Sequence, residues 1–254
     1  MARILGLFLS ALLLLAGCGE SGEASAPASS STTRASGFTD AACADLIVVA
    51  VRGQQQSPDK NYGAGTEIRL LATELTRLVQ ARSDTTVRLE SIDYESNPAP
   101  DLQAYQTAVA GGSRTLDQRL DRIEADCSDS RIAVIGFSMG AQVVHESLAD
   151  RPEGHLRLVA LIADPLRDPV ADYVQATFGT AAPNPGSLGA GPLFTDLSRR
   201  VITFCAPGDD VCNHSAGASR RAVDTIHKHY YEQPEHVATM AARMLKMLRD
   251  DSGS

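Results

Sequence analysis

Short apolar runs alternate with longer amphipathic segments from about residue 38 onward, and this alternation limits the possible folds more than any other feature. The runs are rich in β-branched residues and often apolar on both faces, which is typical of buried parallel strands. They span residues 45–52, 87–94, 131–136, 156–163 and 200–205. The pattern therefore predicts five strands in a sheet that is covered on both sides.

The segments between these runs have the apolar spacing of helices. They span residues 66–82, 104–126, 141–150 and 235–249. Strands that alternate with helices predict a parallel sheet with right-handed crossovers. The expected fold is α/β, a doubly wound three-layer sandwich around a five-stranded parallel sheet. In such folds the functional site lies beyond the carboxyl ends of the strands.

One connection departs from this alternation of strands and helices. Residues 165–198 are rich in proline and glycine and show only a weak helix signal near 170–178. A long segment at the carboxyl edge of the sheet is consistent with a lid over the site, and equally with a surface excursion. The sequence leaves both interpretations open.

The N-terminus has the features of an export signal. A short cationic start precedes an apolar run over residues 4–15, which is too short to span a bilayer as a stable helix. The run ends in residues 15–18 (LAGC), which look like a bacterial lipobox; the alternative is an ordinary signal peptide with an incidental cysteine. We expect cleavage before Cys18 and a diacylglyceryl anchor on its thiol, which would hold the exported protein on the extracellular side of the cell membrane.

Three parts follow from this interpretation. Residues 1–17 are the signal peptide, residues 18–37 form a flexible tether of mostly Ser, Ala, Gly and Thr, and residues 38–254 form one domain. The formal net charge is −8 and there is no basic run, which argues against nucleic acid or anionic lipid as an electrostatic partner. We expect a monomer whose membrane association depends on the lipid alone.

The cysteine count agrees with export. Five cysteines are an odd number, and assigning Cys18 to the lipid leaves four. An oxidising compartment would pair these four as disulfides.

Residues 136–140 (GFSMG) fit the G-x-S-x-G pattern of a nucleophile elbow. The pattern follows a predicted strand and precedes a predicted helix, which is the strand–turn–helix context that the elbow requires. Ser138 would then project at a helix N-terminus, where the N–H of Met139 can stabilise an oxyanion. The structural alternative is a tight turn with a serine that has no catalytic role.

A serine nucleophile needs a base and an acid that follow it in the chain. The candidate acids are Asp209 and Asp210, which lie between two cysteines after the last predicted strand. Of the four later histidines, one lies too close to this loop and one lies in the last helix. The residues alone leave His227 and His229 as candidate bases.

With these motifs the chain resembles the cutinase family of serine esterases, in its actinobacterial branch. Residues 52–53 end the first strand as the family's R-G-[ST] motif does. The block C-x-x-G-D-x-V-C spans residues 205–212, and the family's acid maps onto Asp209. Residues 227–230 fit the family pattern H-x-x-Y, so the resemblance favours His227 as the base.

The resemblance also implies the disulfides. Cys127 stands eleven residues before Ser138, as the family's first-disulfide cysteine stands before its nucleophile. The implied bridges are Cys43–Cys127 and Cys205–Cys212.

The chain departs from the family at the oxyanion hole. Gln54 occupies the position that usually carries a hydroxyl, although its backbone N–H is still available, and Met139 replaces the usual glutamine after the nucleophile. The resemblance implies two-step acyl transfer without metal or organic cofactor, acting on short- to medium-chain acyl esters or lipids. Two alternatives stay open: a degenerate cell-surface binding protein on the same fold, and an acyltransferase that uses the same triad.

Overall fold

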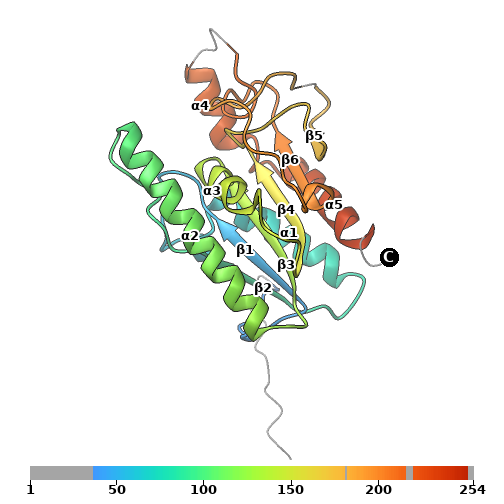
Figure 1. The fold of residues 1–254 in the computed structure, drawn as a ribbon. Helices are drawn as coiled ribbons and strands as arrows, with labels where there is room; N and C mark the ends of the chain where they lie inside the picture. Colours follow the sequence, from blue (N-terminus) through green and yellow to red (C-terminus); the bar gives the residue numbers. More distant parts are fainter. Residues whose placement is uncertain (1–36, 181, 216–219, 251–254) are drawn as a thin grey trace, which may run out of the picture. The chain divides into compact units, whose positions relative to one another are not determined.

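The computed structural model describes residues 37–180, 182–215 and 220–250, which form an α/β sandwich (Figure 1). Six parallel strands make one sheet in the order β2-β1-β3-β4-β6-β5. The strands are β1 (Leu46–Val51), β2 (Val87–Ser91), β3 (Arg131–Phe137), β4 (Leu156–Ile162), β5 (Val174–Thr177) and β6 (Val201–Cys205). The α/β class expected from the sequence is confirmed.

Helices cover both faces of the sheet. The helices are α1 (Thr66–Gln80), α2 (Leu102–Asp126), α3 (Met139–Leu148), α4 (Arg220–His229) and α5 (Pro234–Asp250), with short 3-10 turns at Asn61–Gly63 and Ser198–Arg200. Two apolar clusters follow from this layering: α1 and α5 pack on one face of the central strands, and α2 and α3 on the other. The strands β1, β3, β4 and β6 are buried almost throughout, as their β-branched sequences predict.

The sheet has six strands rather than the expected five. The weak helix expected near 170–178 is wrong, because the chain there forms β5, which pairs with β6 at the edge of the sheet. Val174 is 42% exposed and Ala176 is 3% exposed, so this short strand alternates between solvent and core. Pairing with the free edge of β6 satisfies its backbone, which is a tertiary effect that a local helix signal does not contain. The helix α4 was also not among the predicted elements.

The segment 165–198 is bound to the body of the domain on two sides. The buried ring of His145 in α3 contacts the Asp164 carboxylate through Nδ1 at 2.6 Å and the Pro192 carbonyl through Nε2 at 2.8 Å. Burial alone lowers the pKa of His145, but the Asp164 carboxylate outweighs this, so the pKa lies above its ordinary value of 6.5. The imidazolium thus connects α3 to the end of β4 and to the far end of the segment.

On its other side the segment is held by Arg167. Its buried guanidinium donates to three backbone carbonyls, those of Ala182, Asn184 and Cys212. Since Cys212 closes the loop after β6, the segment and that loop are tied together. These contacts favour the interpretation of residues 165–198 as a surface loop held in place over that of a lid.

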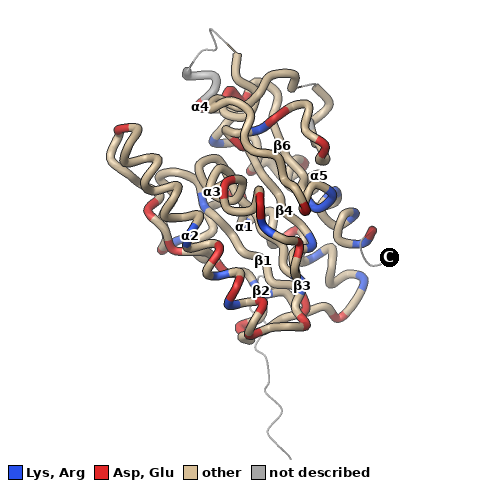
Figure 2. Tube along the Cα trace, viewed as in Figure 1, with Lys and Arg blue, Asp and Glu red and all other residues tan. Residues whose placement is uncertain are grey.

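Charges lie mainly on the helices and loops. Basic and acidic residues alternate along α2 from Arg114 onward, while the trace of β1 is free of them (Figure 2). Among the residues that the structure describes, no helix is both long and apolar enough to cross a membrane.

The strand order places a switch point between β1 and β3. From β1 the chain moves outward to β2 and then returns to β3 on the opposite side of β1. The loops after β1 and β3 therefore diverge at the carboxyl edge and leave a crevice, where open α/β sheets bind their ligands. Gln54 follows β1 and Ser138 follows β3.

Candidate active site

Ser138 lies in a strained turn between β3 and α3. Its φ of 55° and ψ of −120° lie far from ordinary helix or strand values. Its own N–H donates to the Ile162 carbonyl at 2.9 Å, which fixes the turn against β4. A non-glycine residue held in this way is a feature of functional sites.

The glycines two residues before and after Ser138 are required because a side chain at either position would not fit. A Cβ on Gly140 would lie 2.0 Å from the carbonyl oxygen of Val51, and one on Gly136 would lie 2.6 Å from the carbonyl of Gly140. Backbone atoms cannot give way at these distances. The end of β1 is thus pressed directly against the start of α3.

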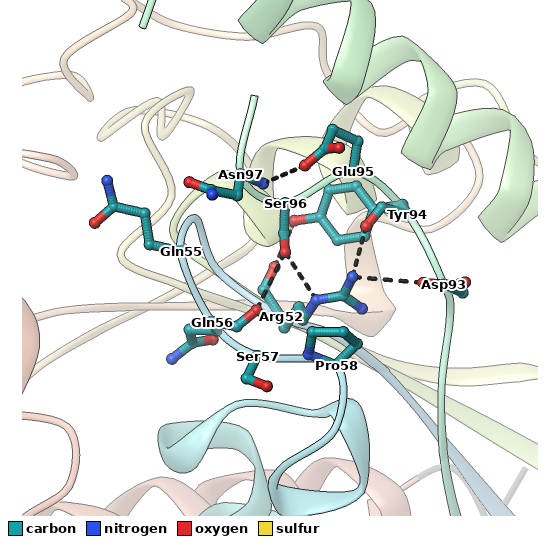
Figure 3. A pocket seen from close by; sticks show the side chains of 10 residues that line it. All are labelled: Arg52, Gln55, Gln56, Ser57, Pro58, Asp93, Tyr94, Glu95, Ser96 and Asn97. Atoms are coloured by element: carbon teal, nitrogen blue, oxygen red, sulfur yellow. Dashed lines mark hydrogen bonds and ion pairs between the residues drawn. The ribbon is translucent and has the colours of Figure 1, made fainter. Parts of the chain in front are cut away.

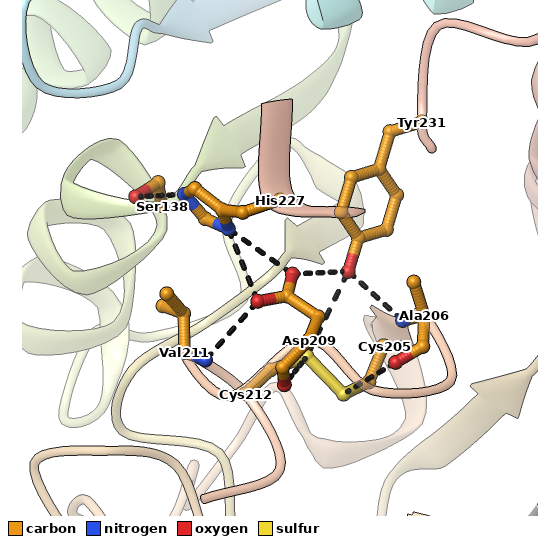
Figure 4. A network of polar contacts seen from close by, with 8 residues as sticks. All are labelled: Ser138, Cys205, Ala206, Asp209, Val211, Cys212, His227 and Tyr231. Carbon is orange, nitrogen blue, oxygen red and sulfur yellow. Dashed lines mark hydrogen bonds and ion pairs between the residues drawn. A yellow bond between two sulfur atoms is a disulfide. The ribbon is translucent and has the colours of Figure 1, made fainter. Parts of the chain in front are cut away.

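His227 lies against Ser138 (Figure 4). Its Nε2 lies 2.9 Å from Ser138 Oγ, and its Nδ1 lies 3.1 and 3.2 Å from the two carboxylate oxygens of Asp209. The ring stacks on Phe137 at 5.1 Å between centroids. With Nδ1–H donating to the carboxylate, Nε2 is free to accept the serine proton.

Asp209 is completely buried, in the loop closed by the Cys205–Cys212 disulfide. Its Oδ1 accepts from the Val211 N–H at 3.0 Å, and its Oδ2 accepts from the Tyr231 hydroxyl at 2.8 Å. A buried carboxylate is costly unless it is hydrogen-bonded, and these donors provide that stabilisation.

Tyr231 is a site residue that the sequence pattern did not identify. Its hydroxyl accepts from the Ala206 N–H at 2.9 Å and is fully buried, and burial raises its pKa well above the ordinary value. The H-x-x-Y pattern points to Tyr230, but the ring of Tyr230 stacks on His236 at 3.8 Å. The only signal in the sequence was a second tyrosine next to the first.

The other candidates lie elsewhere. His229 is 67% exposed, and its Nδ1 lies 3.8 Å from Glu232. Asp210 pairs with His214 at 2.9 Å. Neither contacts the Ser138 hydroxyl or the ring of His227.

In the loop after β1, beside the nucleophile elbow, one backbone N–H is available to bind a substrate oxygen. The Gly53 N–H donates to Gln56 Oε1 at 2.7 Å, and the Gln55 N–H donates to the Ser96 carbonyl at 2.7 Å. Between them, the N–H of Gln54 has no partner within the described part of the chain, and the Gln54 side chain is exposed. Met139 is the first residue of α3, where N–H groups have no intrahelical acceptor.

A buried glutamate supports this loop. The amide of Gln56 donates to Glu67, which is 4% exposed near the start of α1, and burial raises the pKa of this carboxyl. Gln56 therefore links α1 to the backbone next to Gln54. No sequence motif indicated this contact.

Both implied disulfides are present in the structure, Cys43–Cys127 and Cys205–Cys212. Cys18 lies outside the described residues. In the described ranges, no three His, Cys, Asp or Glu side chains are grouped to hold a metal ion.

A polar pocket of about 760 Å³ opens beside the loop after β1 (Figure 3). It lies between this loop and the segment that follows β2. It is lined by Arg52, Gln55, Gln56, Ser57, Pro58, Asp93, Tyr94, Glu95, Ser96 and Asn97.

The chain is similar in sequence to known esterases. Carboxylesterase Culp1 of Mycobacterium tuberculosis is 30% identical over 174 residues, covering 67% of this chain and 69% of Culp1. A cutinase of Kineococcus radiotolerans is 26% identical over 177 residues, covering 68% and 52%.

Solved structures share the fold. A cutinase-like protein from Cryptococcus sp. has a TM-score of 0.60 at 18% identity, covering 80% of this chain and 95% of that one. Trichoderma reesei cutinase bound to a phosphonate inhibitor has a TM-score of 0.55 at 17% identity, covering 81% and 77%. The model of the cutinase family matches residues 42–244, which include the elbow, both bridges and the histidine-bearing helix. The chain therefore belongs to the cutinase family of serine esterases.

Proposed function

We propose that this chain hydrolyses carboxylic esters of short to medium acyl length, with Ser138 as nucleophile, His227 as base and Asp209 as acid. One observation carries the proposal: an unbroken series of hydrogen bonds runs from Ser138 Oγ through both ring nitrogens of His227 to Asp209. The name of its relative, carboxylesterase Culp1, supports the same reaction class.

The first step is acylation. His227 Nε2 takes the proton from Ser138 as Oγ attacks the ester carbonyl, and Asp209 stabilises the imidazolium that forms. The N–H groups of Gln54 and Met139 stabilise the negative oxygen of the tetrahedral intermediate. The imidazolium then protonates the departing alcohol, and the acyl group stays on the serine.

The second step is hydrolysis of the acyl-enzyme. Water loses a proton to His227 as it attacks the acyl carbon, and the same amides stabilise the second tetrahedral intermediate. Collapse of that intermediate returns the proton to Ser138 and releases the acid. No step requires a metal or an organic cofactor.

Labelling with a fluorophosphonate tests the nucleophile directly. We expect stoichiometric phosphonylation of Ser138, identified by peptide mass mapping, and none in Ser138→Ala. A protein that hydrolyses esters while Ser138 stays unlabelled would contradict the assignment. Absence of both labelling and turnover would favour a binding protein on this fold.

The location is a second part of the proposal. We propose export and a diacylglyceryl anchor at Cys18, supported by the apolar run and the LAGC sequence at residues 15–18. The native protein should partition into the detergent phase in Triton X-114, and Cys18→Ser should move it to the aqueous phase. If Cys18→Ser partitions like the wild type, the anchor is wrong and the esterase proposal is unaffected.

A further inference from the structure

The N–H of Gln54, which we assign to the oxyanion hole, follows a glycine that no larger residue could replace. A Cβ on Gly53 would lie 2.8 Å from the ring of Phe137 and 3.2 Å from its carbonyl oxygen. Phe137 is the last residue of β3 and directly precedes the nucleophile, so the loop after β1 packs against the elbow here. Without a side chain, Gly53 does not restrict the rotation of the peptide unit that follows it.

Gln56 restricts this rotation with both its side chain and its backbone. Its Oε1 accepts from the Gly53 N–H at 2.7 Å, and its own N–H donates to the Gly53 carbonyl at 3.4 Å. The peptide unit between Gly53 and Gln54, here called the oxyanion peptide, is planar, so its N–H points away from its carbonyl. With the carbonyl turned toward Gln56, the N–H of Gln54 is turned to the opposite side, where it has no acceptor among the residues that the structure describes.

Glu67 holds the side-chain amide of Gln56 in this orientation. The Gly53 N–H can only donate, so it faces the amide oxygen, and the amide nitrogen donates to Oε2 of Glu67. Glu67 is 4% exposed and lies in the first turn of α1. Gly65, with a φ of 78°, leaves room for the amide, because a Cβ there would lie 2.1 Å from Gln56 Oε1. The start of α1 is therefore built around this amide.

Ser96 holds the backbone of Gln56 from the other side of the loop. Its hydroxyl accepts from Arg52 Nε at 2.9 Å and donates to the Gln56 carbonyl at 3.2 Å (Figure 3). Arg52 is 3% exposed, so this contact is shielded from solvent. Gln56 is thus fixed at its backbone by Ser96 and at its amide by Glu67, and a side chain fixed at both ends can hold a peptide precisely.

We propose that Gln56 and Glu67 are positioning residues of the oxyanion hole, which keep the N–H of Gln54 turned toward the substrate oxygen. The inference rests on the proposed function. Gln56 acts on the oxyanion peptide directly, and Glu67 acts through Gln56. Without them Gly53 can rotate, and the tetrahedral intermediate loses one of its two donors. The hydrogen bonds of the catalytic triad involve neither residue.

Two substrates that differ in one atom measure the oxyanion hole separately from the triad. The probes are p-nitrophenyl butyrate and its thiono analogue, in which sulfur replaces the carbonyl oxygen, and kcat/KM is measured from released p-nitrophenol. Sulfur is a weak hydrogen-bond acceptor, so amides placed for an oxyanion favour the oxygen ester, and we expect a wild-type preference of at least about tenfold. The triad carries out the same steps with either ester. The ratio of the two kcat/KM values also does not depend on the fraction of enzyme that is folded.

Gln56→Met tests the direct contact. Methionine keeps the length of the side chain and removes both side-chain hydrogen bonds. The variant should lower kcat/KM for the oxygen ester by about ten- to a hundredfold and for the thiono ester by less than about threefold, because one donor of the oxyanion hole is displaced. Gln118→Met makes the same change at an exposed position of α2 and should leave the ratio unchanged.

Variants of Glu67 test whether it acts through Gln56. Glu67→Ala should lower the ratio by about three- to tenfold, and Glu67→Gln should restore most of it, since its amide oxygen can accept the same hydrogen bond. Adding Glu67→Ala to Gln56→Met should have little further effect. Glu74→Ala is the control, because Glu74 lies on the same helix and pairs with Arg77 instead.

The outcomes separate this inference from the proposed function. If Gln56→Met keeps the wild-type ratio, or lowers both rates equally, the positioning role is wrong and the esterase stands. If Glu67→Gln lowers both rates as much as Glu67→Ala does, Glu67 acts by its charge and not through Gln56, and its assignment is wrong. If the wild type hydrolyses neither ester, the proposed function itself fails.

Discussion

The phenol of Tyr231 has one proton, and its surroundings decide where that proton goes. The Ala206 N–H can only donate, so it occupies a lone pair of the hydroxyl at 2.9 Å. The remaining polar neighbour at normal hydrogen-bond distance is the Asp209 carboxylate at 2.8 Å, which accepts the proton. Tyr231 thus fixes the orientation of Asp209 and stabilises the negative charge on Oδ2, which also lies 3.1 Å from His227 Nδ1. It is a positioning residue.

Tyr231→Phe should lower kcat/KM about tenfold with little change in KM, because one hydrogen bond to a charged group is lost. A carboxylate with one donor fewer holds the imidazolium of His227 more firmly. The acid limb of the kcat/KM profile should therefore move to higher pH.

Two comparisons distinguish positioning from simple loss of packing. Tyr230→Phe removes a neighbouring hydroxyl from a ring that stacks on His236, and it should leave the pH profile unchanged. In an Asp209→Asn background, Tyr231→Phe should have almost no further effect on kcat. Fully additive effects would show that Tyr231 does not act through Asp209.

At the scale of elements, the buried pair of His145 and Asp164 holds the segment 165–198 on α3. The pKa of His145 is raised in the folded state, so the pair's contribution to stability is complete below about pH 6.5. That contribution is lost as the pH rises through the raised pKa. The free energy of unfolding should therefore fall with rising pH above 6.5.

His145→Ala leaves Asp164 buried without its partner and should cost about 3–5 kcal/mol. It should also remove this pH dependence and speed amide hydrogen exchange in residues 165–198. His155→Ala is the control, because its half-buried ring makes no such pair. Unchanged exchange in the segment would contradict the role of His145 as its attachment.

The two disulfides have different tasks. Cys43–Cys127 closes a separation of 84 residues, and removing it should cost about 4–5 kcal/mol, whereas removing Cys205–Cys212, with a separation of 7, should cost about 2–3. The short bridge holds the loop of Asp209, so its loss should lower kcat more. Urea unfolding and ester hydrolysis of the paired Cys→Ser variants measure both effects. A larger loss of kcat from the long bridge would contradict this division.

Some strands and site residues could be predicted from the sequence and others could not. Five of the six strands were identified because the signal of each is local, in four of them a buried apolar run; β2 is buried only at Val87. The edge strand β5 was missed, since four residues gain their stability from pairing with β6 and not from their own pattern. Ser138 and Asp209 lie in spaced motifs that can be read from the sequence, whereas the contacts of Tyr231 and Gln56 join distant segments and have no such pattern.

The whole molecule explains why the site lies where it does. The order of strands opens a crevice between β1 and β3, and the loops after these strands carry Gln54 and Ser138. The loop after β6 and the helix α4 bring Asp209 and His227 to the same edge. Four separate segments thus meet at one end of a rigid sheet, which is the arrangement a precise acyl-transfer site requires.

The most direct test is the hydrolysis of p-nitrophenyl butyrate by the wild type and by Ser138→Ala, His227→Ala and His229→Ala. Because nucleophile and base act as a unit, the first two variants should fall to a similar floor, at least about 10⁴-fold below the wild-type kcat. The exposed His229 should be dispensable, so His229→Ala should keep most of the activity. Activity retained in Ser138→Ala, or lost in His229→Ala and kept in His227→Ala, would contradict the proposed triad.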